Sequence, residues 1–466
     1  MGTRMDYGAL LPEIALLIGA VAVLLTGSYL PRRRQWPTLL IAAAALTGAI
    51  VAGIVQALQS PTTVFTGSFA LDAGSAAVRI LAPAATAAVI VLGQPELRRT
   101  ARESETIALL LLATLGALVV AGADDLLVLA TGFLLSSIPL YGLIGITRTA
   151  AAAEAVTKTY LQGALFGVTM LGGIALLFAA AGATAYPSLT AAVAAAPAVV
   201  VALGAIAVTV GLLFEAGATP AHFWVPDATQ ASSRAVGAFL TTVPKLAALA
   251  ALLRLVTTLQ PAVDLPLVIA VVAAASMTIG NLAAFWQQDV RRLLGWSTVS
   301  QVGYLLLAVT AGAAAPAAGG ALLAYLAGYT ATNLTAFAVV AALPDRATID
   351  HWRGAARAHP ALTGALIIAL LSLVGTPPTA VFFGKLAVFI AAWDAGYGWL
   401  VSIAAINTVV SLFYYLRWIV AAVGRTDAAP DAAKRAPGGL ALVLGAATLA
   451  LGAATVLLLG PNLTLV

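Results

Sequence analysis

The sequence has 466 residues, of which 62% are hydrophobic and 9% are charged, and its mean hydropathy is +1.02. Soluble domains carry about 25% charged residues, so the composition predicts a protein embedded in a membrane. The chain has no Cys and three His, which excludes disulfides and Cys-ligated iron–sulfur clusters and argues against a metal site. The net charge of +5 comes from basic residues spread over short connections and is no sign of nucleic-acid binding.

Apolar runs of bilayer-spanning length follow one another along the chain. A transmembrane helix needs about 20 apolar residues, and the sequence contains about 14 such runs, which predicts an all-α polytopic membrane protein. The runs lie near residues 8–30, 37–59, 69–93, 104–121, 123–146, 156–182, 190–216, 235–259, 264–286, 293–311, 316–343, 360–392, 397–421 and 437–460.

Basic residues concentrate in every second connection between these runs. The odd connections hold Arg32, Arg33, Arg34, Arg98, Arg99, Arg102, Arg148, Arg234, Arg291, Arg292, Arg346, Arg353, Arg357, Arg425, Lys434 and Arg435. The even connections hold acids instead, among them Asp124, Asp125, Asp264 and Asp394. The positive-inside rule places the odd connections in the cytoplasm, so both termini are predicted outside.

No soluble domain fits between the runs. The longest connections, near residues 217–234 and 344–359, have fewer than twenty residues. No strand pattern precedes a Gly-rich phosphate-binding loop, which excludes the usual nucleotide and dinucleotide motifs. Any nucleotide or flavin chemistry is therefore expected on a partner.

Four charged residues sit within apolar surroundings, where a central Lys costs about 2.5–3.5 kcal/mol on insertion scales. They are Lys158, Glu215, Lys245 and Lys385. Three of them lie beside predicted helix breaks: Glu215 precedes Gly217 and Pro220, Lys245 follows Pro244, and Lys385 follows "LVGTPPTAVFFGK". A broken helix in a membrane frees backbone groups and often marks a transport pathway.

The remaining charges in or near spans have a simpler structural interpretation. Four of them lie near span ends, where a long side chain can reach the interface; they are Glu13, Glu154, Arg254 and Arg417. Asp72 and Arg79 are seven residues apart in one predicted span, on the same helix face, and are predicted to form a local charge pair or a packing contact.

The four buried charges suggest proton transfer. Desolvation disfavours the charged form of a buried Lys or Glu, so such groups can exchange protons with neighbours. Hydroxyl, amide and imidazole groups could bridge them; the candidates are His222, Thr241, Thr242, Gln301, Tyr304 and Tyr325. Ser297, Ser300 and Asn333 also lie within spans, where such residues more often join helices.

Six motifs occur in an order typical of one superfamily. They are "EAVTKTYLQGALF" (154–166), "PAHFWVPDATQ" (220–230), "TTVPKLAALAALLR" (241–254), "QQDVRRLLGWSTVSQVGYLLLAV" (287–309), "SLVGTPPTAVFFGKLAVF" (372–389) and "FYYLRW" (413–418). From about Leu10 to Leu458, the chain resembles the antiporter-like membrane subunits of bacterial NADH–quinone oxidoreductase (complex I), and subunit N in particular. Related chains occur in cation/proton antiporters and membrane hydrogenases.

The resemblance implies two inverted five-helix repeats, each with a broken helix. The corresponding segments are 1–103 (three N-terminal helices), 104–259 (first repeat), 260–421 (second repeat) and 422–466 (C-terminal helix). The family lysines carry over to Lys158, Lys245 and Lys385, and the histidine of "HFW" is His222.

Three positions depart from the family pattern. The family acid five residues before a Pro is here Leu134, before Pro139. The family lysine of the broken seventh helix is here Glu215, and a His that some relatives carry before "GY" is here Gln301. Glu215 is therefore expected to be a relocated partner of Lys158 or Lys245, or else to mark a chain that no longer pumps by the family route.

The resemblance implies a proton-translocating subunit of a complex I-type oxidoreductase in a bacterial plasma membrane, with the proton path Lys158, Glu215, Lys245, Lys385, His222, Gln301 and Tyr304. The chain would perform no redox step and hold no cofactor or metal. NADH, FMN, iron–sulfur clusters and quinone would belong to partner subunits, and its partners would be other membrane subunits and lipid.

Three alternatives remain at this level. Sodium-dependent transport would reveal a cation/proton antiporter subunit, and neighbouring genes would reveal a membrane hydrogenase. Full pumping by charge-neutralised variants would reveal a proton-inert scaffold.

Overall fold

The computed structural model describes residues 6–98, 102–259, 264–425 and 432–459, so Arg99 of the third connection lies outside the described residues. The chain divides into two compact units. The first comprises Met1–Ala87, Glu96–Trp224 and Val243–Val268, and the second comprises Ala88–Pro95, Val225–Thr242 and Ile269–Val466. The division into repeats at residues 104–259 and 260–421 stays a prediction.

The predicted fold class is confirmed. Within the described residues, 13 helices are long and apolar enough to cross a membrane. The interrupted pair of 15-residue helices α16 and α17 accounts for the remaining predicted span. A small antiparallel hairpin, for which the sequence showed no pattern, joins Thr62–Val64 (β1) to Phe69–Leu71 (β2).

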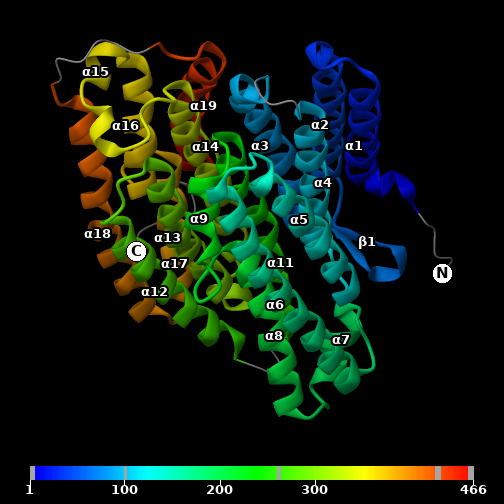
Figure 1. Cartoon of the computed structure of the whole chain (residues 1–466). Helices are drawn as coiled ribbons and strands as arrows, with labels where there is room; N and C mark the ends of the chain where they lie inside the picture. Colours follow the sequence, from blue (N-terminus) through cyan, green and yellow to red (C-terminus); the bar gives the residue numbers. More distant parts are fainter. Residues whose placement is uncertain (1–5, 99–101, 260–263, 426–431, 460–466) are drawn as a thin grey trace. The chain divides into compact units, whose positions relative to one another are not determined.

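The first unit holds most of the N-terminal half (Figure 1). Its helices are α1 (Leu11–Tyr29), α2 (Trp36–Ala57), most of α3 (Ala73–Leu97), α4 (Glu103–Gly122), α5 (Leu126–Gly145), α6 (Ala150–Ala181), α7 (Tyr186–Val193), α8 (Ala198–Ala216) and α11 (Val243–Leu259), with the 3₁₀ turns η1 (Tyr7–Leu10), η2 (Arg32–Arg34) and η3 (Phe65–Gly67).

The second unit holds the remaining elements. They are most of α9 (Trp224–Ala231), α10 (Arg234–Leu240), most of α12 (Leu265–Ala284), α13 (Val290–Ala311), α14 (Ala318–Ala342), α15 (Ala355–Ala358), α16 (Pro360–Val374), α17 (Ala380–Asp394), α18 (Gly398–Val423) and α19 (Arg435–Leu459), with η4 (Gly312–Ala314) and η5 (Ile349–Trp352).

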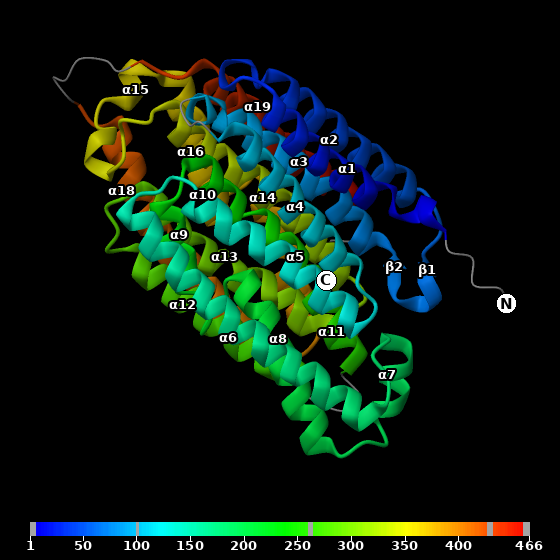
Figure 2. The same cartoon turned by 45° about the vertical axis from the view of Figure 1, so that its right-hand side comes forward.

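Helix α4 is central to the first unit. It packs against α1, α5 and α11 (Figures 1 and 2). Gly116 of α4 allows the closest approach, because a Cβ there would lie 2.2 Å from the backbone nitrogen of Ser136 on α5. Small residues at such crossings let membrane helices pack through their backbones, and this crossing fixes Ser136 inside the unit.

Helix α14 plays the same part in the second unit, where it packs against α13, α16, α17 and α19. The α14–α17 contact depends on glycines from both sides. A Cβ on Gly328 would lie 2.8 Å from Ala380 Cβ, and a Cβ on Gly384 would lie 2.7 Å from Tyr325 Cα. This close approach brings the start of α17 to the buried face of α14.

The third and seventh spans begin later than the sequence suggested. Phe69–Leu71 pair with the preceding strand, so α3 begins only at Ala73. The apolar run from residue 190 is divided between α7 and α8, because Pro197 caps the start of α8. Hydropathy identifies both segments as apolar, but it does not show where within them the helix begins.

The predicted Asp72–Arg79 pair is wrong. Asp72 lies before α3 and binds Arg254 at 2.6 Å. Arg79 instead forms a bidentate ion pair with Glu13 of α1. Its Nε and Nη2 atoms donate to the two carboxylate oxygens, each at 2.8 Å. Glu13 is 6% exposed and Arg79 is 1% exposed, so Glu13 is a buried structural partner.

We predict that Glu13→Gln destabilises the protein by about 3–5 kcal/mol, because removing one partner leaves a buried charge uncompensated. Asp350→Asn is the matched control, since the Asp350–Arg353 pair has side chains that are 75% and 63% exposed and such pairs contribute about 1 kcal/mol or less. Thermal unfolding of the purified protein measures both changes. Equal small losses would contradict a structural role for the Glu13–Arg79 pair.

Candidate functional site

Helix α8 ends at a glycine in the left-handed conformation. Gly217 has φ +78°, which residues with a Cβ rarely adopt. The amides of Gly217 and Ala218 bond back to the carbonyls of Leu213 and Phe214, as in a Schellman cap. The carbonyl of Glu215 receives none of these bonds and needs another donor.

Lys245 of α11 supplies that donor. Its Nζ lies 3.2 Å from the Glu215 carbonyl oxygen and 4.4 Å from the centre of the Trp224 ring. The Trp224 indole donates in turn to the Phe214 carbonyl at 3.0 Å. Lys245 is fully buried, so its charge is stabilised by the negative end of α8 and by an aromatic face.

The Glu215 side chain is enclosed beside this contact. It is 3% exposed, and neither carboxyl oxygen has a hydrogen-bond partner of acceptable geometry among the described residues. Its polar neighbours are Ser136 and Lys245. The structure therefore brings Glu215 and Lys245 together, but the lysine binds the backbone of Glu215 and not its carboxylate.

Lys158 has different surroundings from those predicted. It forms an ion pair with Glu154, one turn away on α6, at 2.6 Å, and its side chain is 48% exposed. Leu134, which occupies the position of the family acid, is also 43% exposed. His222 follows the end of α8 and is 2% exposed, with its ring 4.2 Å from that of Phe223.

The second unit repeats the arrangement at α16. Gly375 has φ +94°, and the amides of Gly375 and Thr376 close the same cap on Leu371 and Ser372. Lys385 of α17 donates to the carbonyls of Leu373 and Val374 at 3.0 and 2.9 Å. Its Nζ lies 4.0 Å from the centre of the Tyr304 ring.

The two sites share one backbone position. Glu215 and Leu373 each stand two residues before the left-handed glycine of their helix, and each offers its carbonyl to a buried lysine. The lysine comes from α11 in the first unit and from α17 in the second. The shared element is therefore the interrupted helix end, with the ammonium acting as its cap.

Predicted bridging residues surround Lys385. Gln301 of α13 donates to the same Leu373 carbonyl at 2.8 Å and accepts from the Tyr325 hydroxyl at 2.6 Å. The Tyr304 hydroxyl accepts from Thr408 at 3.4 Å. Gln301, Tyr304 and Tyr325 thus form a polar cluster with Lys385 in one unit.

Thr241 and Asn333 form a separate polar contact in that unit. The Asn333 amide donates to the Thr241 hydroxyl at 2.8 Å, and Tyr329 donates to the Thr241 carbonyl at 2.8 Å. Thr242 bonds back to its own helix at Ala238. Threonine 241 and its partners therefore join α10 to α14, as expected for polar residues between membrane helices.

Sequence reasoning missed the partners of the lysines. The Gly and Pro residues predicted the two breaks, but not that backbone carbonyls would receive the ammonium groups. Trp224 and Ser136 were also missed. The aromatic residue in "HFW" was a possible signal for a buried cation, whereas Ser136 resembles any helix-joining serine.

Comparisons with known proteins give one consistent result. The family described as NADH:quinone oxidoreductase/Mrp antiporter, transmembrane, matches residues 123–411. NADH-quinone oxidoreductase subunit N from Mycobacterium sp. (strain JLS) is 51% identical over 91% of this chain and 90% of its own length. Subunit N 1 from Streptomyces griseus is 48% identical over 94% and 92%.

A solved structure agrees with these relatives. A chain of respiratory complex I from Thermus thermophilus with bound aureothin is 31% identical, with a TM-score of 0.78 over 97% of this chain and 98% of that one.

We predict that Gly375→Ala destabilises the protein by about 1–2 kcal/mol, the cost of the left-handed conformation for a residue with a Cβ. The new Cβ would also lie 3.0 Å from Lys385 Cδ and displace the ammonium. Gly364→Ala in the same helix is the control, because a Cβ there meets nothing within 4 Å. Thermal unfolding compares them, and equal stability would show that the helix end tolerates a different conformation.

Proposed function

The chain belongs to the antiporter-like membrane subunits of NADH–quinone oxidoreductase and is similar to subunit N, and on that premise we propose that Lys245 and Lys385 are the two proton-binding groups of its translocation path. The observation that carries the proposal is the pair of buried ammonium groups capping interrupted helices. Neither lysine has a carboxylate within ion-pair distance among the described contacts.

Such a contact couples protonation to the helix end. A protonated lysine donates charge-assisted hydrogen bonds to the carbonyls, and these are roughly twice as strong as neutral ones. Loss of the proton weakens them and leaves carbonyl groups unsatisfied in a dry environment, which costs about 1–3 kcal/mol each. Loading and unloading therefore favour different positions of the helix end, as alternating transport requires.

The remaining residues of the path take neighbouring roles. Glu215 accepts or supplies the proton of Lys245, and Gln301 and Tyr304 position Lys385. His222 lies on the connection that follows α8 and would act as a bridging group of the first site. Lys158, whose side chain is half-exposed, acts at the surface of α6.

The redox chemistry belongs to the assembly. The relatives are subunits of an oxidoreductase complex, and this chain would contribute proton transfer without an electron-transfer step. NADH, FMN, iron–sulfur clusters and quinone would be bound by partner subunits. The other membrane subunits of a complex I-type assembly are its partners, in a bacterial plasma membrane. A pumping yield that depends on sodium would instead favour the antiporter alternative.

Neutralising either buried lysine tests the proposal. Lys245→Met and Lys385→Met keep the length of the side chain and remove the proton-binding nitrogen, so each should lower the protons moved per NADH oxidised in inside-out vesicles. Removing a positioned proton-transfer group slows its step by about 100-fold or more. Lys434→Met is the control, because Lys434 lies in the connection before α19. Normal proton yields in both buried-lysine variants, in an assembled complex, would refute the proposal.

The chain has no native Cys, so single Cys substitutions can test its orientation in the membrane. Arg353→Cys should react with a membrane-impermeant thiol reagent only from the cytoplasmic side, since Arg353 is in an odd, basic connection and its side chain is 63% exposed. Asp394→Cys, at the end of α17, should react only from outside. The opposite pattern would reverse the orientation, and reaction of both from one side would contradict the span count.

A further inference from the structure

A polar pocket lies at the start of α5, between the β1–β2 hairpin, α7 and α11 of the first unit. Its volume is about 690 Å³, and its lining includes Thr63 of β1, Asp72, Asp124, Tyr186 of α7 and Arg254 of α11. Figures 1 and 2 show the hairpin and α7 close together at this end of the unit. We call it the hairpin pocket. The connections that form it are acidic ones, which the positive-inside rule predicts outside the cell.

One carboxylate of the hairpin pocket has no counter-charge of its own. Asp72 pairs with Arg254 at 2.6 Å, and the other terminal nitrogen of Arg254 donates to the Ala123 carbonyl at 3.1 Å. Among the residues that the structure describes, none forms an ion pair or a hydrogen bond with the Asp124 carboxylate. Burial raises the pKa of this carboxyl, although Arg254 acts to lower it. Arg254 therefore compensates Asp72 and leaves Asp124 short of positive charge.

A buried hydroxyl in the same pocket also lacks a partner. Tyr186 is 3% exposed, and its hydroxyl has no hydrogen bond among the described residues. Its charged neighbours are Arg254, Asp124 and Asp125. Asp125 is already bonded, because its carboxylate caps α5 and accepts from the Thr184 hydroxyl. An unsatisfied buried hydroxyl is costly, so the pocket is expected to hold a group that bonds to Tyr186 and Asp124.

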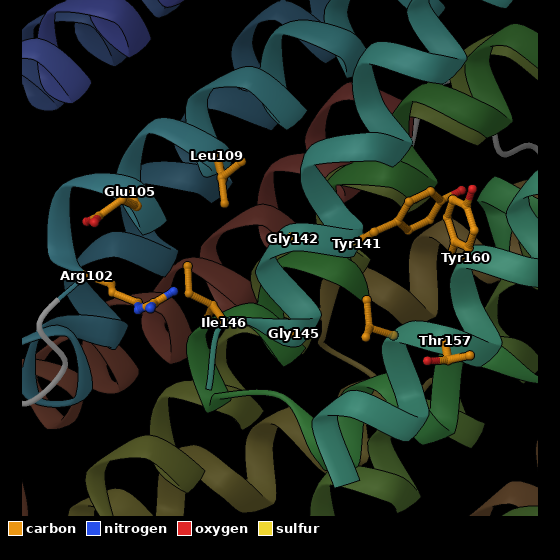
Figure 3. A pocket seen from close by; sticks show the side chains of 10 residues that line it. Arg102, Glu105, Leu109, Tyr141, Gly142, Gly145, Ile146, Thr157 and Tyr160 are labelled. Atoms are coloured by element: carbon orange, nitrogen blue, oxygen red, sulfur yellow. The ribbon is translucent and has the colours of Figure 1, made fainter. Parts of the chain in front are cut away.

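The second pocket of this unit, at the opposite end of α5, has neither feature (Figure 3). It contains one charge of each sign, Arg102 and Glu105, and the pair Tyr141 and Tyr160. The two rings pack edge to face with centroids 5.8 Å apart, and neither hydroxyl is a buried atom without a partner. The uncompensated acid and the unsatisfied hydroxyl are therefore specific to the hairpin pocket.

The chemistry of the pocket fits a primary ammonium group better than a metal ion. Calcium and magnesium favour several carboxylate ligands, whereas Arg254 brings a positive charge into the pocket. No group of three His, Cys, Asp or Glu side chains that could hold a metal occurs within the described part of the chain. An ammonium group has three donors, and the Asp124 carboxylate and the Tyr186 and Thr63 hydroxyls can accept them.

We propose that the hairpin pocket binds a primary ammonium group, with Asp124 as its counter-charge and the Tyr186 and Thr63 hydroxyls as further acceptors. The group belongs either to the ethanolamine headgroup of a phospholipid or to a free amine in water, and both offer the same three donors. Neither Lys245 nor Lys385 lines the pocket, so the inference is independent of the proposed proton path.

The first experiment measures binding by protection of a single thiol. Thr257→Cys is labelled with N-ethylmaleimide in the purified, assembled complex, because Thr257 lines the pocket and is exposed. At ten times its Kd, ethanolamine should slow this labelling by about tenfold, since only the unoccupied fraction reacts. Thr66→Cys is the control, because Thr66 is exposed at the tip of the hairpin and does not line the pocket; its labelling should not change.

Ligand specificity decides between an ammonium site and other sites. Choline has the same charge as ethanolamine but no N–H donor, and ethanol has no charge; neither should protect Thr257→Cys. Equal protection by choline would show general attraction of cations and overturn the proposal. Protection by magnesium chloride without protection by ethanolamine would show a metal site and would also overturn it, as would a complete lack of saturable protection by ethanolamine.

The second experiment changes the proposed ligands of the ammonium. Asp124→Asn and Tyr186→Phe, each combined with Thr257→Cys, should weaken ethanolamine binding by roughly tenfold or more, because each removes a hydrogen bond to a charged group. Asp264→Asn is the matched control, since Asp264 caps the start of α12 through the Leu267 amide and lies outside the pocket. Unchanged affinity in both pocket variants would overturn the proposal.

The third experiment identifies the source of the ammonium group. The Thr257→Cys complex is placed in lipid nanodiscs of either phosphatidylethanolamine or phosphatidylcholine. Slow labelling in the phosphatidylethanolamine discs alone, without added amine, would assign the site to a lipid headgroup. Equal labelling in both discs, slowed only by added ethanolamine, would assign it to a free amine. Labelling that neither the lipid nor the added amine slows would overturn the proposal.

Discussion

A helix that ends inside a membrane exposes carbonyl groups to a medium without donors, and this constraint organises both halves of the protein. A buried ammonium has the opposite need, because it requires acceptors that water would otherwise provide. Lys245 at the end of α8 and Lys385 at the end of α16 satisfy both needs with the same contacts. A helix break and a buried lysine are therefore stable together, whereas either one alone would leave polar groups without hydrogen-bond partners and would destabilise the protein.

The two sites differ in what stands beside the lysine. At α16, Gln301 shares the Leu373 carbonyl with Lys385 and accepts a hydrogen bond from Tyr325, so the polar side chains described beside this lysine are neutral. At α8, the residue whose carbonyl binds the lysine is Glu215, and its carboxyl oxygens have no hydrogen-bond partner of acceptable geometry among the described residues. The first site therefore contains a carboxyl group beside its lysine, which the second site lacks among the described residues.

The features that the sequence predicted are those that local composition determines. The features that it missed depend on tertiary contacts. Hydropathy located the spans, and the glycine–proline pairs at residues 217–220 and 375–378 located the breaks. Burial was harder, because a membrane helix is apolar toward lipid as well as toward protein. Two features show this: the exposure of Lys158 on the 32-residue α6 and the pairing of Glu13 with Arg79. Both depend on which faces of helices far apart in the sequence pack together, and the composition of a single span does not determine that packing.

The family pattern has its acid on α5, whereas this chain has it on α8. The difference between lipid-facing and protein-facing positions bears on this change as well. Leu134 is 43% exposed, whereas Glu215 is 3% exposed. A carboxyl at position 134 would face whatever covers α5, and its environment would depend on a neighbouring molecule. At position 215 the carboxyl is enclosed by helices of its own unit, and its polar neighbours are Ser136 and Lys245. We infer that an acid at position 215 does not depend on a neighbouring molecule, since this chain itself supplies its described surroundings.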